Sequence, residues 1–517
     1  MPSDAPTVPG ILRHQARSRA DHPLLVCDGD RISYAEADRR SAELARGLIA
    51  QGGGKGTHVG LLYPNGTEFV VGMLAAARIG AVVIPFSTFA TARELREQLM
   101  DSDAEILLAT ASFRSHDYVQ RLAEVLSHAE PDNDERLFVT ATPQLRHVIV
   151  NPERVYRLAR SVDPALLDAM EDDVDGCDPL AIVYTSGSTS APKGVVHTHA
   201  GLLGHQRNLN AIRGLTTADK LFCNSPFFWI GGFAFGLLAT LVAGSTLVCS
   251  NAGDPGQTLD LLEAEKPTMA NGFAAGIAYL ADHPSFAGRD LSSMRRGNLY
   301  PIMDPAARPA DPELRHNMLG MTEAGSVLLI SDDESDQPES RRGSFGKPAP
   351  GFDAMILDPD ASGVGELCIR GPYVMQRYYK RSREECFDAD GWFHTGDLVR
   401  TDDDGFFYFV RRLSAMLKTA GANVSAAEVE KAIATVTGGA VAHVVGIPDA
   451  QRGQLVAAVV VTPDGATFDE AALRERLKGE LSSYKIPKRF IALAHNEIPL
   501  LSSGKVDSQR LGRLFDA

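Results

Sequence analysis

The chain has 517 residues, which is too long for one hydrophobic core, so we expect two or more domains. Hydrophobic residues make up 44% and charged residues 23% of the sequence, a composition that is ordinary for a soluble globular protein. The formal net charge of −15 would repel a polyanion, which argues against nucleic-acid binding.

The six cysteines are scattered and include no C-x-x-C pair. This spacing argues for reduced thiols in a cytoplasmic protein, and against a metal site or a disulfide framework. The N-terminal sequence lacks a basic segment followed by an apolar stretch, so we expect no signal peptide. The sequence therefore predicts a cytoplasmic location.

Residues 221–253 contain no charged side chain, and the segment is long enough to cross a bilayer. However, Pro226, Gly231, Gly232 and Gly236 interrupt it, and Gly244 precedes a short strand at residues 247–249. These breakers favour a buried helix followed by a buried strand over a transmembrane helix.

The first part of the chain alternates between helical and strand patterns. Ser33 and Glu36 form a capping box that opens a helix through Leu48. A strand at residues 58–63, a helix at 68–79 and a second strand at 81–84 follow. This order is typical of α/β layers.

After about residue 340 the pattern changes to short strands and tight turns. Residues 365–370 alternate in polarity, and residues 398–400 are expected to pair with 406–410, which predicts a small barrel or antiparallel sheet. Beyond Arg412, the patterns predict helices at 426–434 and 469–481 and strands at 440–446 and 456–461. We therefore predict a large N-terminal domain at 1–411 and a small α+β domain at 412–517.

A loop rich in hydroxyl groups follows the apolar strand at residues 180–183. Free backbone N–H groups and hydroxyls can surround phosphate oxygens, while a lysine supplies a positive charge. The kinase-type phosphate loop is excluded, because Pro192 replaces its second glycine and Gly194 replaces its metal-binding hydroxyl. The predicted phosphate-binding residues are Thr185, Ser186, Gly187, Ser188, Thr189 and Lys193.

This loop resembles the signature loop of the adenylate-forming superfamily, which comprises acyl-CoA and aryl-CoA ligases, peptide-synthetase adenylation domains and luciferases. Further motifs of that superfamily follow in the same order along nearly the whole chain. They are Gly320-Met321-Thr322-Glu323, Gly391 to Asp397, Arg412 with Gly421 and Glu428, Tyr484-Lys485-Ile486-Pro487, and Ser503-Gly504-Lys505. Each motif alone is weak evidence, but their order is highly specific.

The resemblance implies roles for the large-domain motifs. Glu323 would hold Mg²⁺, because hard divalent cations prefer carboxylate oxygens, and Thr322 would bind the α-phosphate. Asp397 would accept the ribose hydroxyls, and Arg412 would reach the ribose or a phosphate. The same sequences also fit a helix-capping Thr-Glu pair, a turn aspartate and a surface arginine.

In the adenylate-forming superfamily, which this chain resembles, the small domain rotates between two half-reactions and carries a catalytic lysine. Lys505 matches that lysine, which would neutralise charge as the carboxylate attacks phosphorus. Ser414 occupies the hinge position, and Gly421 would lie near the pantetheine channel. Lys485, Lys488 and Arg489 would attract CoA phosphates or simply solvate the small domain.

Residues 224–236 match the stretch that lines the carboxylate pocket in this family. No acidic side chain occurs there to pair with an amine, so we predict a carboxylate without an amino group. Trp229, Gly231 and Phe233 are the predicted pocket residues, with Trp229 either a pocket wall or ordinary core. Leu319 stands where relatives stack an aromatic ring on adenine, and Tyr300 is expected to compensate.

These observations predict an AMP-forming acyl-CoA ligase that uses ATP, Mg²⁺ and coenzyme A on a fatty or alicyclic acid. Two alternatives stay open at this point: an enzyme that loads a carrier protein instead of CoA, and a non-catalytic nucleotide-binding relative. A homodimer is compatible with the resemblance.

Overall fold

The computed structural model describes residues 6–127, 130–131, 135–185, 193–274, 277–413, 416–449, 452–462, 468–500 and 506–516. The chain forms two compact units. The second unit consists of Arg412–Ala517 together with the short segments Phe89–Gln98 and Thr185–Lys193, and the first consists of the remainder. In the described residues, no helix is both long enough and apolar enough to cross a membrane.

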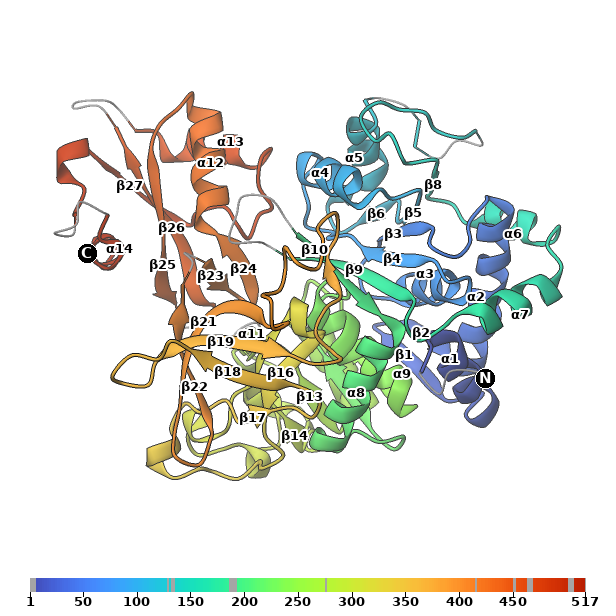
Figure 1. Cartoon of the computed structure of the whole chain (residues 1–517), viewed down its shortest axis with the longest axis horizontal. Coiled ribbons are helices and arrows are strands. Elements are labelled where there is room, and N and C mark those ends of the chain that lie inside the picture. Colours follow the sequence, from blue (N-terminus) through green and yellow to red (C-terminus); the bar gives the residue numbers. More distant parts are fainter. Residues whose placement is uncertain are drawn as a thin grey trace. The chain divides into compact units, whose positions relative to one another are not determined.

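One large sheet of the first unit has the order β20-β10-β9-β4-β3-β5-β8 (Figure 1). Strand β3 pairs in parallel with β4 and β5, and β5 pairs in parallel with β8. This confirms the predicted α/β layers. The strands are β3 (His58–Leu62), β4 (Val82–Pro85), β5 (Ile106–Ala109), β8 (His147–Ile149), β9 (Pro179–Thr185), β10 (Lys193–Thr198) and β20 (Arg377–Tyr378).

A second sheet of this unit has the order β14-β13-β11-β12-β1-β2. Its strands pair in parallel except for the β1–β2 hairpin. The strands are β1 (Pro23–Cys27), β2 (Asp30–Ser33), β11 (Lys220–Cys223), β12 (Thr246–Cys249), β13 (Met269–Asn271) and β14 (Arg296–Gly297).

The helices of the first unit are packed against these sheets, and α2 contacts α1, α3, α6 and α7 (Figure 1). As predicted, the Ser33 side chain caps α2 by accepting a hydrogen bond from the Glu36 N–H. The helices are α1 (Val8–Ser18), α2 (Tyr34–Ala50), α3 (Thr67–Arg78), α5 (Tyr118–Val125), α6 (Glu153–Ala159), α7 (Pro164–Asp173), α8 (His199–Arg213), α9 (Ala239–Ala243), α10 (Pro255–Glu265) and α11 (Ala278–Ala281). Helix α4 (Ala92–Ser102) begins in the segment Phe89–Gln98 of the second unit.

Helix α3 is buried except at Glu68, and most of its residues are apolar. Its buried charged residue, Arg78, forms ion pairs with Glu171 and Asp38, so the buried charge is compensated. The uncharged segment 221–253 folds as the predicted buried helical stretch and strand. Its helical part is the π-helix η1 (Gly231–Leu238) followed by α9, and its strand is β12.

The predicted antiparallel region follows. Strands β15 (Leu319–Met321), β16 (Ser326–Ile330) and β17 (Lys347–Pro348) form a three-stranded sheet. Strands β18 (Asp353–Leu357), β19 (Gly365–Arg370), β21 (Phe393–Thr401) and β22 (Phe407–Arg412) form a four-stranded one. The predicted pairing of residues 398–400 with 406–410 corresponds to the neighbouring strands β21 and β22. A short hairpin, β6 (Ser112–Phe113) and β7 (His116–Asp117), lies elsewhere in this unit.

The second unit has its own hydrophobic core, built around a three-stranded sheet in the order β25-β26-β27. Helices α12 and α13 contact each other, and α12 packs on β25. Its elements are β23 (Met416–Thr419), β24 (Ala422–Ser425), α12 (Ala426–Thr437), β25 (Ala442–Asp449), β26 (Gly453–Val461), α13 (Glu470–Leu477), β27 (Arg489–Leu493) and α14 (Ser508–Arg513). The helices and strands predicted beyond Arg412 are all present.

Candidate active site

The predicted phosphate loop connects two neighbouring strands, since Thr185 ends β9 and Lys193 begins β10. Ser186, Gly187, Ser188 and Thr189 lie outside the described residues, as do Ser414 and Lys505. The flanks of the loop are firmly held. The Tyr184 hydroxyl donates to Asp101 Oδ2 over 2.6 Å, and a Cβ at Gly194 would lie 2.7 Å from Ile182 Cγ2.

Thr322 and Glu323 lie together on a short 3₁₀ turn, η7 (Thr322–Ala324), between β15 and β16. The turn is held by its backbone carbonyls. The Thr322 carbonyl accepts from His197 Nε2 at 2.7 Å, and the Glu323 carbonyl accepts from the Met375 N–H at 2.8 Å. Burial lowers the pKa of His197 to about 4, so the imidazole is neutral and its Nε2–H is the donor.

The Glu323 carboxylate accepts a hydrogen bond at Oε1 from the Tyr378 hydroxyl, 2.8 Å away. Burial, together with the neighbouring Glu323 charge, raises the pKa of Tyr378, which therefore remains a neutral donor. Among the described residues, no cationic side chain pairs with Glu323. A positioned carboxylate without a protein cation would suit Mg²⁺, and the role of Glu323 as a metal ligand stays a prediction. Tyr378 itself carries no sequence signal, because it reaches Glu323 only through strand β20.

Asp397 is buried on β21, at the end of a turn whose backbone is specified by its neighbours. Its N–H donates to the Thr395 hydroxyl at 3.1 Å, and that hydroxyl donates to the Leu367 carbonyl at 2.7 Å. Gly396 has a φ of 73°, a conformation that favours glycine. The Thr-Gly-Asp order thus has a structural cause, namely the sharp turn that orients Asp397.

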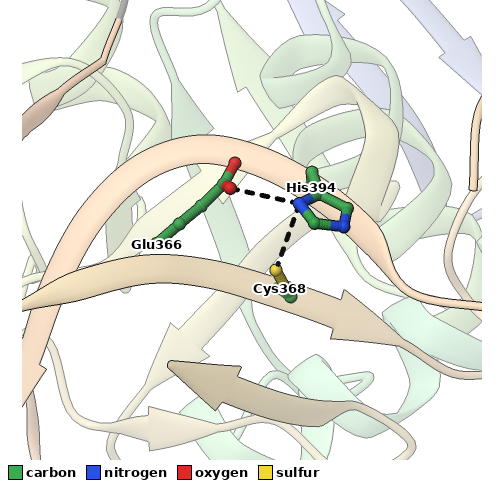
Figure 2. A group of neighbouring side chains, drawn as sticks. All are labelled: Glu366, Cys368 and His394. Atoms are coloured by element: carbon green, nitrogen blue, oxygen red, sulfur yellow. Dashed lines mark hydrogen bonds and ion pairs between the residues drawn. The ribbon is translucent and has the colours of Figure 1, made fainter. Parts of the chain in front are cut away.

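Glu366, Cys368 and His394 form a cluster beside this turn, on neighbouring strands β19 and β21 (Figure 2). Glu366 Oε2 accepts from His394 Nδ1 at 3.1 Å, and its Oε1 accepts from the Gly396 N–H at 2.9 Å. On the opposite side of the ring, His394 Nε2 lies 3.4 Å from Asp388 Oδ2. Glu366 therefore connects His394 to the turn that carries Asp397.

The residue types of this cluster could also suggest a metal site, since their ligand atoms lie within 4.8 Å of one another. However, burial raises the pKa of the Cys368 thiol to about 11, whereas a metal requires the thiolate. Both Glu366 oxygens already accept hydrogen bonds. The cluster is better explained as a support for the Asp397 turn, and sequence analysis did not identify it.

The His394 ion pairs predict a pH-dependent stability. The hydrogen bond to Glu366 is the main reason that the pKa of His394 is raised above its usual value. Its stabilising contribution is therefore complete below about pH 6.5 and is lost as pH rises through the folded-state pKa. Thermal melting of wild type and H394Q should differ by up to about 2 °C at about pH 6, because the pair is partly exposed, and converge by about pH 8.5. An equal difference at both pH values would contradict this assignment.

The predicted pocket residues occupy different environments. Trp229 is half-buried and makes edge contacts with Phe228 and Phe273, at 5.5 and 6.0 Å between ring centroids. Gly231 is also half-buried, whereas the structure places Phe233 in the hydrophobic core, edge-on to Phe69. The pocket roles of these residues stay predictions.

A cavity of about 70 Å³ lies in the first unit, next to strands β13, β14 and β15. Phe235, two residues after Phe233, lines it together with Asn271, Gly297 and Tyr300. Met318, which directly precedes Leu319, also lines it. Tyr300 thus faces this cavity, and its role in adenine packing stays a prediction.

The binding residues predicted in the second unit begin at Arg412, which ends β22. Gly421 lies in a two-residue turn between β23 and β24, where Ala420 and Gly421 have φ values of 46° and 84°. These values are typical of a tight hairpin turn and favour a glycine.

One expectation about basic residues in this unit was wrong. Lys485 is neither a surface charge nor available to CoA phosphates, because it is buried with its Nζ 2.7 Å from both Glu94 Oε1 and Glu428 Oε1. Arg489 likewise contacts the protein itself, through the Phe515 carbonyl. Lys488 and Arg489 are both exposed.

Comparison with known proteins identifies the family of this chain. The family model described as AMP-binding enzyme matches residues 12–379, and the AMP-binding enzyme C-terminal domain matches residues 428–505. A feruloyl-CoA synthase from Amycolatopsis is 31% identical, and the match covers 94% of each chain. A 3-[(3aS,4S,7aS)-7a-methyl-1,5-dioxo-octahydro-1H-inden-4-yl]propanoyl:CoA ligase from Mycobacterium tuberculosis is 30% identical, with 99% of this chain and 100% of that protein covered.

The fold is shared with solved structures. The o-succinylbenzoate CoA synthetase of Bacillus subtilis superposes with a TM-score of 0.77 at 24% identity, covering 97% of each chain. The motif order, the fold and both family matches agree along the chain. The chain therefore belongs to the AMP-binding enzyme family of the adenylate-forming superfamily, and it is an AMP-forming acyl-CoA ligase that uses ATP, Mg²⁺ and coenzyme A.

Proposed function

We propose that this ligase acts on a fatty or alicyclic carboxylic acid that lacks an amino group. In the first half-reaction a carboxylate oxygen attacks the α-phosphorus of ATP, forming an acyl-adenylate and releasing pyrophosphate. In the second, the CoA thiol attacks the acyl carbonyl and AMP leaves, with the thiol proton passing to solvent.

Residues of the first unit are proposed to bind the nucleotide. The single observation that carries this proposal is the Thr322–Glu323 turn, which His197, Met375 and Tyr378 hold through three hydrogen bonds. A fixed turn keeps the hydroxyl and the carboxylate in place before substrate arrives, so little ordering is needed at the reacting centre. Mg²⁺ bound at Glu323 would supply charge neutralisation for the phosphates. Asp397 would bind the ribose.

The sequence and the local structure both support a substrate acid without an amino group. Residues 221–253 contain no acidic side chain, and Trp229 packs among aromatic rings there. An ammonium group in such surroundings would be buried without a counter-charge, which is costly. The names of the feruloyl-CoA synthase and the bicyclic propanoyl:CoA ligase both describe acyl groups without an amine, which supports the proposal.

The test uses the full-length protein with ATP, Mg²⁺, CoA and a panel of short, long, aromatic and steroid-like acids. Pyrophosphate and acyl-CoA are measured together, with an amino-acid set as the contrasting panel and K505A as the variant expected to lose adenylation. We expect both products with one class of non-amino acid. Pyrophosphate release with amino acids alone would overturn the proposal, and pyrophosphate without acyl-CoA would favour carrier-protein loading.

We further expect Y378F to weaken the binding of Mg²⁺ without unfolding the protein. Removing a hydrogen bond to a charged carboxylate should lower kcat/KM for pyrophosphate release by about 10-fold. Because Tyr378 acts through Glu323, the Mg²⁺ concentration that gives half-maximal rate should rise. Y379F is the matched control, since the Tyr379 hydroxyl donates to Asp103 and not to Glu323. An unchanged Mg²⁺ dependence in Y378F would contradict this role.

A cytoplasmic location and a homodimer remain predictions. The cysteines are free in the structure, consistent with the reduced thiols that the sequence predicted.

A further inference from the structure

Arg213 is the last residue of α8, and it is buried with 8% of its surface exposed. Its Nη2 donates to Asn210 Oδ1 and to the Phe235 carbonyl, both at 3.0 Å, and its Nη1 donates to Asn271 Oδ1 at 3.3 Å. The guanidinium also lies over the Phe235 ring, 3.9 Å from the centroid. All these partners are neutral.

The charge of Arg213 is therefore uncompensated by any carboxylate of the described residues. Burial lowers its pKa to about 9, so the guanidinium still carries its charge at neutral pH. Its Nε is buried without a hydrogen-bond partner in the described part of the chain. By contrast, nearby Arg296 pairs with Asp219 at 2.8 Å and Arg315 pairs with Asp336 at 2.6 Å. A buried cation with an unused donor is costly unless something binds to it.

Arg213 lines the 70 Å³ cavity, and so do Phe235, Asn271 and Met318. Two carboxylates, Asp333 and Glu334, also line the cavity, but both residues are exposed. Asp333 already accepts hydrogen bonds from Ser335 and Gln337. Among the charged residues that line the cavity, Arg213 is therefore the buried one.

Strand β15 relates this cavity to the predicted adenylation residues within the same unit. Met318 borders the cavity, and Thr322 lies four residues farther along the chain. At about 3.3 Å per residue, this separation is on the order of 10 Å. An acid whose carboxylate reacts near Thr322 would therefore have to be on the order of 10 Å long for its far end to reach the cavity.

We propose that Arg213 recognises an oxygen acceptor at the far end of the acid, on the order of 10 Å from the carboxylate that is activated. This inference rests on the proposed function and deepens it by naming the substrate class: acids with a second oxygen function, whether a ketone, a hydroxyl or a second carboxylate. That oxygen would compensate the guanidinium charge. Arg213 is thus a specificity-determining residue.

The test compares acids in matched pairs on the full-length protein, with pyrophosphate release as the readout. The pairs are decanoic acid with sebacic acid, decanoic acid with a methyl-ketone acid of equal length, and decanoic acid with 10-hydroxydecanoic acid. We expect the oxygen-bearing member of at least one pair to have a kcat/KM about 10-fold to 100-fold higher. The three pairs distinguish a second carboxylate from a neutral ketone and from a hydroxyl.

In R213M the ratio within the preferred pair should fall towards one, while R213K should keep part of it. R207M is the matched control, because Arg207 is an exposed residue of the same helix. Equal kcat/KM values within every pair in the wild type would overturn the inference even if R213M fails to fold. An unchanged ratio in a folded R213M would also overturn it. Absence of pyrophosphate with every acid would instead contradict the proposed function.

Discussion

Replacing Glu323 with glutamine is expected to lower kcat/KM for acyl-adenylate formation by about 100-fold to 1,000-fold. Glutamine keeps the size of the side chain and can still accept the hydrogen bond from the Tyr378 hydroxyl. The change removes the negative charge, which is the property that a Mg²⁺ ligand needs. Steady-state pyrophosphate release measured across a Mg²⁺ titration should show both a lower maximum and a higher Mg²⁺ requirement.

The matched control is E313Q, which removes one exposed carboxylate from the same unit. It should leave the Mg²⁺ requirement unchanged. Both variants should melt near the wild-type temperature, since neither alters a buried apolar contact. If E323Q has the same Mg²⁺ dependence as the wild type, Glu323 is not the metal ligand.

Replacing Lys485 with methionine is expected to destabilise the second unit by about 3–5 kcal/mol. Lys485 is the shared cation of two buried carboxylates, Glu94 and Glu428, each 2.7 Å from its Nζ. Burial alone would lower the pKa of Lys485, but Tyr484, Glu94 and Glu428 outweigh it and raise that pKa. Without the lysine, two carboxylates would be left close together with no counter-charge. Urea unfolding, followed by a probe in the second unit, measures the loss.

The control is K488M, three residues away on an exposed position, which should change stability by no more than about 0.5 kcal/mol. A K485M/E94Q double variant should recover part of the loss, because one of the two uncompensated charges is removed. Equal stability of K485M and K488M would show that the buried network contributes nothing to the fold.

Local patterns were enough to predict most elements. The capping box at Ser33, the apolar run of α3 and the turn glycines fix helices and strands through interactions between residues close in sequence. The breaking residues of segment 221–253 likewise predicted a buried helical stretch and strand, although not that the helix would be of the π type. There, Gly232 is required because a Cβ would lie 2.1 Å from the Pro226 carbonyl oxygen.

The supporting residues of the site could not be predicted in this way. Tyr378 reaches Glu323 across 55 positions of the sequence, and Glu366 reaches His394 across 28. No sequence spacing predicts either contact, because the pairing of strands brings these residues together. The wrong expectation for Lys485 has the same origin, since its partner Glu94 lies 391 positions away.

The sequence by itself determined the reaction class of this protein, because its short motifs resemble those of the adenylate-forming superfamily and follow in the same order. It also determined the alternation of helices and strands. Only the tertiary structure decided which carboxylate is held by Tyr378, which lysine is buried and which buried arginine of the cavity has no carboxylate partner among the described residues. The physical reason is that hydrogen bonds and charge compensation depend on distances between atoms, and folding brings those atoms together from distant parts of the chain.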